Sequence, residues 1–173
     1  MDLLPLIACR LVSLRHIFYS SGLGSGLSNV APWRDASCKE RFVVLTLSYP
    51  VTNEDIWDMS KQPLKSNLRD ALGFPQYARR VTDCGFVLDI CLADLDLRGS
   101  IDRELVGVAG YSYGARMVQL ISDQPNGIKQ ADPRIKAAIA FSPTARSSSA
   151  AKSMKTVRIP FSASLESMTM TSS

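Results

Sequence analysis

The sequence of 173 residues contains a single histidine, His16, and no two cysteines in the C-x-x-C spacing. A zinc site built from histidine and cysteine needs about four ligands at short spacings. The four cysteines are Cys9, Cys38, Cys84 and Cys91. Cys84 and Cys91 are seven residues apart, on one face of an expected helix, which indicates core packing. We therefore expect no metal site, reduced thiols and a cytoplasmic location.

Blocks of like charge and long apolar runs are also missing. The formal net charge is +4, so nothing indicates nucleic acid or an anionic membrane as a partner. The adjacent Arg79 and Arg80 are interpreted as a solvated helix face. No run reaches the roughly 20 apolar residues of a membrane helix. The apolar N-terminus carries Asp2 where a signal peptide has positive charge, and Pro5 and Arg10 interrupt it.

Short apolar strands alternate with helical patterns along the chain. The strand candidates are residues 16–20, 42–47, 105–110 and 135–141. Helices are expected over residues 29–37, over 76–97 and after Ser112, and the polar segment 51–75 is interpreted as a loop with one helical turn. Every connection between strands is long enough for a crossover, which predicts a parallel sheet with helices on both faces. The strand at 105–110 is expected at the centre, with 16–20 and 42–47 on one side and 135–141 on the other.

The composition changes after Thr144. Serine and other small residues dominate from there to the end of the sequence, and such composition is typical of a poorly ordered segment. We therefore predict one α/β domain over residues 1–144 and a serine-rich, poorly ordered tail over 145–173. The residues after Pro160, FSASLESMT, are not expected to form a strand.

The segment Gly110-Tyr111-Ser112-Tyr113-Gly114 has the spacing G-x-S-x-G between a strand and a helix. A serine at such a sharp turn has a strained backbone, and its side chain stands clear of the sheet. The two glycines avoid a collision around it, and the helix directs free N–H groups at the serine. An incidental serine in a glycine-rich turn is the alternative. The strand before and the helix after favour a nucleophile at Ser112.

Three segments in order resemble the α/β-hydrolases, closest to the dienelactone-hydrolase-like proteins and the platelet-activating factor acetylhydrolases. FYSSGLGSG, residues 18–26, resembles a turn that the family writes F-S-H-G-L-G-G. Residues 79–115 resemble the helix and strand that lead to a G-H-S-F-G-G elbow, and residues 132–145 resemble the next strand. The resemblance implies a three-layer, mostly parallel sheet, here incomplete. It also implies hydrolysis of a small-molecule carboxylic ester or lactone through an acyl-enzyme at Ser112.

The resemblance further implies that the backbone N–H groups of Leu23 and Tyr113 form an oxyanion hole. Gly22 and Gly24 allow the backbone to approach a substrate oxygen closely. The competing interpretation of this glycine-rich turn is a dinucleotide-binding loop. Its spacing is not G-x-G-x-x-G, and the strand at 42–47 has no acidic residue at its end. No cofactor is therefore expected.

The sequence departs from the family at Ser21 and Tyr111, where the family has histidine, and at Ala115, where it has glycine. A larger departure concerns the base. Catalytic residues in this fold follow the order nucleophile, acid, histidine, and no histidine follows Ser112. His16 is interpreted as a structural residue of its strand.

The triad acid should follow a strand that begins at Ile159-Pro160. Glu166 is the only acidic residue after Asp132, so it is the one position to which the acid could be carried over. Two functions remain open. The first is a serine ester hydrolase, truncated or frame-shifted at its ends and weakly active or inactive. The second is a non-catalytic hydrolase remnant or small-molecule-binding domain, because a serine without a base is a weak nucleophile.

Overall fold

The computed structural model describes residues 14–60, 63–94, 101–122, 132–143, 157 and 159–164. Within these ranges, five strands form one sheet in the order β2-β1-β3-β4-β5, and every neighbouring pair is parallel. The strands are β1 (Leu14–Ser20), β2 (Phe42–Leu47), β3 (Ile101–Tyr111), β4 (Ile135–Phe141) and β5 (Phe161–Ser164). The predicted parallel sheet is confirmed, as is the central strand with the three neighbours expected on its two sides.

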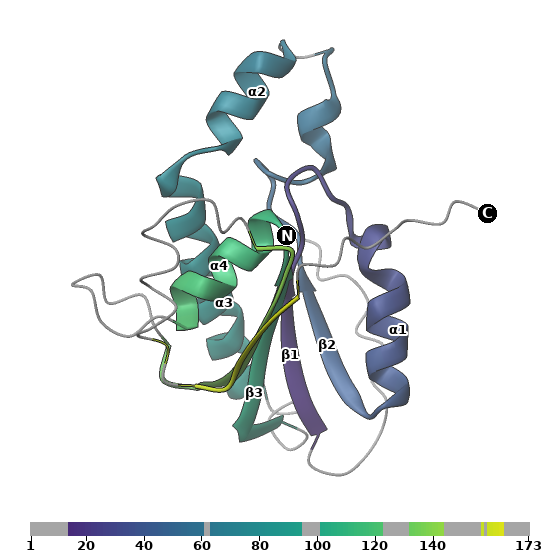
Figure 1. Ribbon diagram of the computed structural model, residues 1–173, viewed down its shortest axis with the longest axis vertical. Helices are drawn as coiled ribbons and strands as arrows, with labels where there is room; N and C mark the ends of the chain where they lie inside the picture. Colours follow the sequence, from purple (N-terminus) through teal and green to yellow (C-terminus); the bar gives the residue numbers. More distant parts are fainter. Residues whose placement is uncertain are drawn as a thin grey trace.

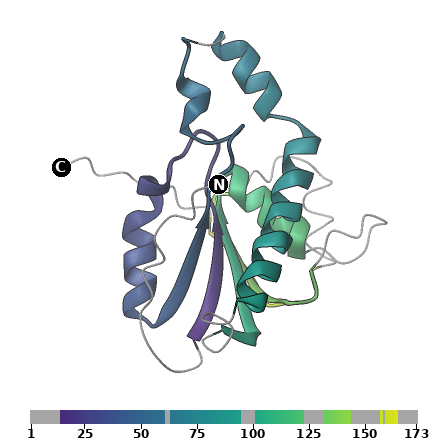
Figure 2. The same ribbon diagram turned by 180° about the vertical axis from the view of Figure 1, so that it is seen from behind.

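Helices cover both faces of this sheet, so the domain has three layers (Figure 1). The helical elements are η1 (Leu27–Val30), α1 (Ala31–Lys39), η2 (Glu54–Trp57), α2 (Leu64–Ala71), α3 (Phe74–Ala93) and α4 (Tyr113–Ser122). In Figures 1 and 2, α1 lies on one side of the sheet and α3 and α4 lie on the other. The η2–α2 segment lies beyond the carboxyl ends of the strands. None of the described helices is long and apolar enough to span a membrane.

Alternating residues of the strands form two cores. Phe18 and Val108 belong to the larger core, which α3 and α4 cover with residues such as Leu88 and Met117. Tyr19 belongs to the smaller core on the α1 side. This alternation follows from the two-residue period of a strand. Because both faces are buried, the central strands read as continuous apolar runs, and this made them recognisable in the sequence.

Two expectations about local structure are wrong. Phe161–Ser164 forms β5, which pairs with β4 from Ala138↔Phe161 to Phe141↔Ser164, although the sequence was not expected to form a strand there. The half-exposed edge strand is held by backbone hydrogen bonds, which do not require an apolar pattern. The segment 51–75 contains η2 and α2, not one helical turn in a loop. Residues 144–156 and 165–173 lie outside the described residues, so the predicted division at residue 144 stays a prediction.

The chain direction changes between β1 and β3. From β1 the chain passes through α1 outward to β2, and it then returns through α3 to β3, on the other side of β1. The carboxyl ends of β1 and β3 therefore mark a topological switch point, where open α/β sheets bind their ligands. The turns after these two strands contain Gly22–Gly26 and Ser112.

Candidate active site

Ser112 alone forms the turn from strand to helix. Tyr111 is the last residue of β3 and Tyr113 is the first of α4. The φ angle of Ser112 is +50°, in the left-handed region that a side chain rarely adopts. Its N–H donates to the carbonyl oxygen of Phe141 at 2.9 Å, and its carbonyl accepts from the N–H of Arg116 at 3.3 Å. These two hydrogen bonds hold the strained residue between β4 and α4.

Gly110 and Gly114 are required by close backbone contacts. A Cβ atom on Gly110 would lie 2.6 Å from the carbonyl carbon of Gly114. A Cβ on Gly114 would lie 2.0 Å from the carbonyl oxygen of Ser20 and 2.8 Å from that of Ser21. In both cases the obstacle is backbone and cannot rotate away. These contacts leave no room for a side chain at either glycine, and they pack the start of α4 against the end of β1.

The turn after β1 is a tight turn over residues 22–25. The N–H of Ser25 donates to the carbonyl of Gly22 at 3.4 Å, and Gly24 has a φ of +69°, as the third residue of a type II turn requires. The Gly22 carbonyl points into the turn. In a trans peptide the following N–H, that of Leu23, therefore points out of it.

Residues beyond β2 fix this turn in place. The N–H of Gly24 donates to the carbonyl of Thr52 at 2.9 Å, and the indole N–H of Trp57 donates to the carbonyl of Gly24, also at 2.9 Å. The Trp57 ring also fills the space that a side chain at Gly24 would need, because a Cβ there would lie 2.5 Å from the ring. No pattern in the sequence indicated that Thr52 or Trp57 belongs to the site.

The two turns meet at the switch point. A Cβ on Gly22 would lie 3.2 Å from the ring of Tyr111 and 3.6 Å from its carbonyl oxygen. Tyr113 begins α4, so its N–H has no partner within the helix. Among the described residues, the N–H groups of Leu23 and Tyr113 and the hydroxyl of Ser112 make no hydrogen bond.

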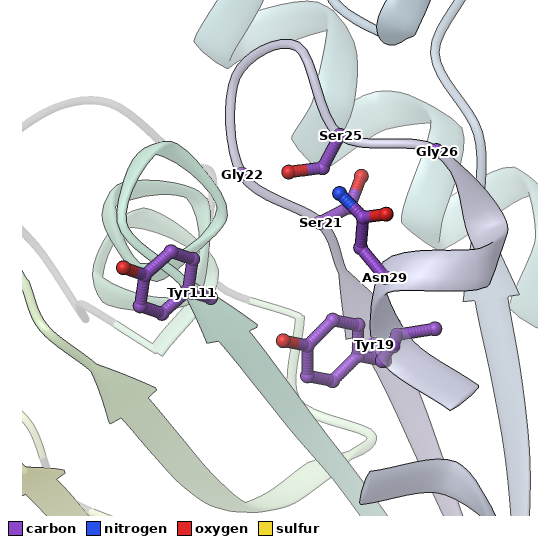
Figure 3. Close-up of a pocket in the computed structure, with 8 residues that line it drawn as sticks. Tyr19, Ser21, Gly22, Ser25, Gly26, Asn29 and Tyr111 are labelled. Carbon is purple, nitrogen blue, oxygen red and sulfur yellow. The ribbon is translucent and has the colours of Figure 1, made fainter. Parts of the chain in front are cut away.

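A pocket of about 110 Å³ lies between the first turn, η1 and the end of β3. Figure 3 shows polar groups of Ser21, Ser25 and Asn29 on one side and the rings of Tyr19 and Tyr111 on the other. Burial, together with the nearby Tyr111, raises the pKa of Tyr19 to about 12. Tyr19 therefore stays protonated and can act as a hydrogen-bond donor to a ligand, but not as a base at neutral pH.

His16 lies far from Ser112. It is buried in β1 and is in register with Val106 of β3. Ser112 follows Val106 by six residues, which corresponds to about 20 Å along a strand. Asp132 precedes β4, at the amino ends of the strands and thus also far from Ser112. It forms an ion pair there with Arg134 at 2.6 Å. Neither residue can serve the elbow, and Glu166 lies outside the described residues.

Arg80 lies near the two turns, and the expectation that it belongs to a solvated helix face is wrong. Arg79 is exposed, as expected for a solvated helix face, but Arg80 is only 1% exposed. Its guanidinium donates to the carbonyl of Ser21 at 2.7 Å. Two adjacent arginines do not indicate which of them is buried, because the neutral groups that accept hydrogen bonds from Arg80 belong to segments distant in the sequence. Among the described residues, no group of histidine, cysteine, aspartate and glutamate is arranged to hold a metal ion.

The strand order, the switch-point site and the serine elbow define the class of fold. The described residues have an α/β-hydrolase-like fold, a three-layer parallel sheet with helices on both faces. No model of a protein family matches the sequence, and no curated protein matches it either. The similarity of this chain to known proteins is therefore a similarity of fold.

Three solved structures share this fold. A ferulic acid esterase from Streptomyces cinnamoneus gives a TM-score of 0.60 at 15% identity, over 88% of this chain and 50% of that protein. A protein assigned as a dienelactone hydrolase from Klebsiella pneumoniae gives 0.60 at 10% identity, over 87% and 72%. A lipase/esterase from Lactobacillus plantarum gives 0.50 at 16% identity, over 88% and 60%. The chain thus spans about half of the first of these proteins.

Proposed function

We propose that this chain is a serine-hydrolase domain that transfers the acyl group of a small carboxylic ester or lactone to Ser112. The observation that carries the proposal is the left-handed Ser112 at a one-residue turn between strand and helix. The close backbone contacts at Gly110 and Gly114 support this proposal, because they leave little room for the turn to relax. Strain of this kind is typical of a nucleophile elbow.

The geometry supports a definite first step. The Ser112 hydroxyl oxygen attacks the ester carbonyl carbon, and the negative charge that develops on the carbonyl oxygen is stabilised by the N–H groups of Leu23 and Tyr113. Collapse of this intermediate breaks the ester C–O bond, and the released alkoxide takes a proton from solvent to become the alcohol. The acyl-enzyme that remains is then hydrolysed by water. The hydroxyl proton must pass to solvent, because the only histidine in the sequence lies on β1, about 20 Å from Ser112 along the strand direction. We therefore expect turnover that is barely measurable.

The pocket beside the elbow favours a small acyl group. Its volume of about 110 Å³ is below the cavity of about 150 Å³ that accommodates benzene in a protein core. We therefore propose that the pocket accepts short acyl groups, from acetyl to butyryl, in preference to long ones.

The proposed location is the cytoplasm. Cys84 and Cys91 are buried free thiols, and reduced thiols are typical of cytoplasmic proteins.

Glu166 is the acid in this proposal. β5 begins directly after Ile159-Pro160, which is where the resemblance to α/β-hydrolases expects the strand before the acid. The carboxyl ends of parallel strands lie at one edge of the sheet. Glu166 follows the end of β5 by two residues. A carboxylate is a much weaker base than the serine alkoxide, so without a histidine it is expected to raise the low rate only slightly.

A second candidate function is binding without catalysis. It is favoured by the Ser112 hydroxyl, which makes no hydrogen bond to a base among the described residues. The site would then hold a small acyl compound in the pocket beside Tyr19 and Tyr111, with no covalent step.

Ester turnover and covalent labelling separate the two candidates. We would measure 4-nitrophenyl acetate hydrolysis and labelling by a fluorophosphonate, with peptide mapping, on monodisperse protein. The first candidate predicts labelling at Ser112 and a slow rate, which Ser112→Ala abolishes and His16→Ala leaves unchanged. Oxyanion stabilisation alone supports about 10³–10⁴-fold over water in a related triad system. Glu166→Gln should lower the labelling rate only slightly.

Ser142→Ala is the matched control. Ser142 also has a left-handed φ, +48°, and lies at the end of the neighbouring strand β4, but no described helix begins after it. Saturable ester binding with no labelling at Ser112 would support the second candidate. Strong turnover that disappears in His16→Ala would contradict both, because it would require a base that the sheet places about 20 Å away.

A further inference from the structure

Arg80 is a buried cation near the two turns of the candidate site. It lies on α3 and is 1% exposed. Burial lowers its pKa, while nearby tyrosines and, last, Asp83 act to raise it; arginine nonetheless stays charged in proteins. Among the described residues no carboxylate forms an ion pair with it. A buried charge without a counter-ion is costly, so its other contacts must compensate.

All three guanidinium nitrogens donate hydrogen bonds. Nη1 donates to the carbonyl of Ser21 at 2.7 Å and to the hydroxyl of Ser20 at 3.3 Å. Nε and Nη2 donate to the hydroxyl of Thr52 at 3.1 and 2.5 Å, and Nη2 also reaches the Thr52 carbonyl at 3.5 Å. That carbonyl also accepts from the N–H of Gly24. Arg80 therefore contacts the residues directly before the turn, and it contacts the middle of the turn through Thr52.

Two aromatic rings enclose the guanidinium. Its Cζ lies 4.1 Å from the ring centroid of Tyr49 and 4.6 Å from that of Tyr113. Tyr113 follows Ser112 directly, and its ring also stacks on Tyr77 with centroids 4.1 Å apart. The Tyr113 hydroxyl donates to a backbone carbonyl at 2.7 Å, that of Ala71. The ring is thus held from three sides, and a cation on its face is attracted to it.

These contacts join the two segments that carry the proposed oxyanion donors. The carbonyl of Ser21 points to Arg80, so the N–H of the same peptide, that of Gly22, points the other way. This fixes the orientation of the chain directly before Leu23. On the other side, the cation contacts the ring of Tyr113, whose N–H is the second donor.

We propose that Arg80 is a positioning residue that holds the turn over residues 22–25 and the start of α4 in the relative position that the oxyanion hole needs. The inference rests on the proposed function at Ser112, and it assigns to a buried arginine a role that its sequence does not suggest. A neutral side chain of similar length would fill the space but release the Ser21 carbonyl and Thr52.

The test combines hydrogen exchange with Ser112 labelling in Arg80→Met, Arg80→Lys and Thr52→Val, with the exposed Arg79→Met as matched control. In Arg80→Met we expect the Gly24 amide to exchange at least about tenfold faster and the fluorophosphonate to label Ser112 about tenfold more slowly, as for a lost charge-assisted hydrogen bond. Amides in the body of α4 should be unchanged. Arg80→Lys should recover part of both effects, and Thr52→Val, which keeps the charge, should give intermediate values.

Each result is decisive. Equal acceleration of exchange in the turn and in α4 would overturn the inference, because it would show only a general loss of stability. Faster turn exchange with unchanged labelling would also overturn it, since the position of the turn would then not matter. If the wild-type chain is not labelled at Ser112, the proposed function fails. Selective acceleration of Gly24 exchange in Arg80→Met, absent in Arg79→Met, would then still support the positional role.

Discussion

Gly114→Ala tests whether the elbow depends on close contact between α4 and the end of β1. The new Cβ atom would lie 2.0 Å from the carbonyl oxygen of Ser20, 2.6 Å from its carbonyl carbon and 2.8 Å from the carbonyl oxygen of Ser21. Favourable carbon–oxygen contacts are about 3.3–3.6 Å long. The helix and the strand must therefore separate by more than about 1 Å at this point, because the overlapping atoms belong to the backbone and cannot rotate away.

Two opposing free-energy contributions set the magnitude. Replacing glycine by alanine in a helix stabilises the fold by about 0.5–1 kcal/mol. Overpacking costs about 1–3 kcal/mol, and two backbone segments in direct overlap lie at the upper end. The expected net loss in the free energy of unfolding is about 2 kcal/mol, or about 4–8 °C in Tm for a chain of this size. Because the displaced strand leads into the turn before Leu23, Ser112 labelling should fall about 100-fold.

The assay is thermal unfolding by circular dichroism together with fluorophosphonate labelling. Gly85→Ala is the matched control, because a Cβ there would meet its nearest atoms, on Asp132 and Arg134, at 3.8 and 3.9 Å. That substitution should raise the stability by about 0.5–1 kcal/mol and leave labelling unchanged. If Gly114→Ala proves as stable and as reactive as wild type while Gly85→Ala behaves as expected, the argument for a sterically fixed elbow is wrong.

Further predictions concern the pocket and the start of β4. Ser112-dependent acylation should be faster with acetyl and butyryl esters than with octanoyl esters, and equal rates would contradict the pocket assignment. For Asp132, burial acts to raise the pKa, but hydrogen bonds from Arg134 outweigh it, and the pKa is lowered. Its stabilising contribution is therefore present above the unfolded pKa of about 3.9 and is lost as pH falls through the lower folded value. Arg134→Met should cost about 1 kcal/mol at pH 7 and flatten the pH dependence of Tm below pH 5; an unchanged acid profile would refute this.

The sequence determined the elements whose signal is local. The strands Phe42–Leu47 and Ile135–Phe141 have the bounds that their apolar runs predicted, because strands buried on both faces need side chains that avoid water. The glycines around Ser112 were informative for a similar reason. Only glycine fits where backbone meets backbone, so the requirement is visible in the residue type itself.

The remaining features depend on tertiary contacts that the sequence does not encode locally. β5 forms at Phe161–Ser164 because the edge of β4 supplies hydrogen-bond partners, and a serine-rich segment accepts them as readily as an apolar one. Arg80 is buried because Ser21 and Thr52 supply acceptors and two tyrosines enclose its charge. From the sequence it could not be told from the exposed Arg79. Folding brings together segments about 60 residues apart, as in the contact of Arg80 with Ser20. This tertiary contact determines that Arg80, and not Arg79, is buried near the site.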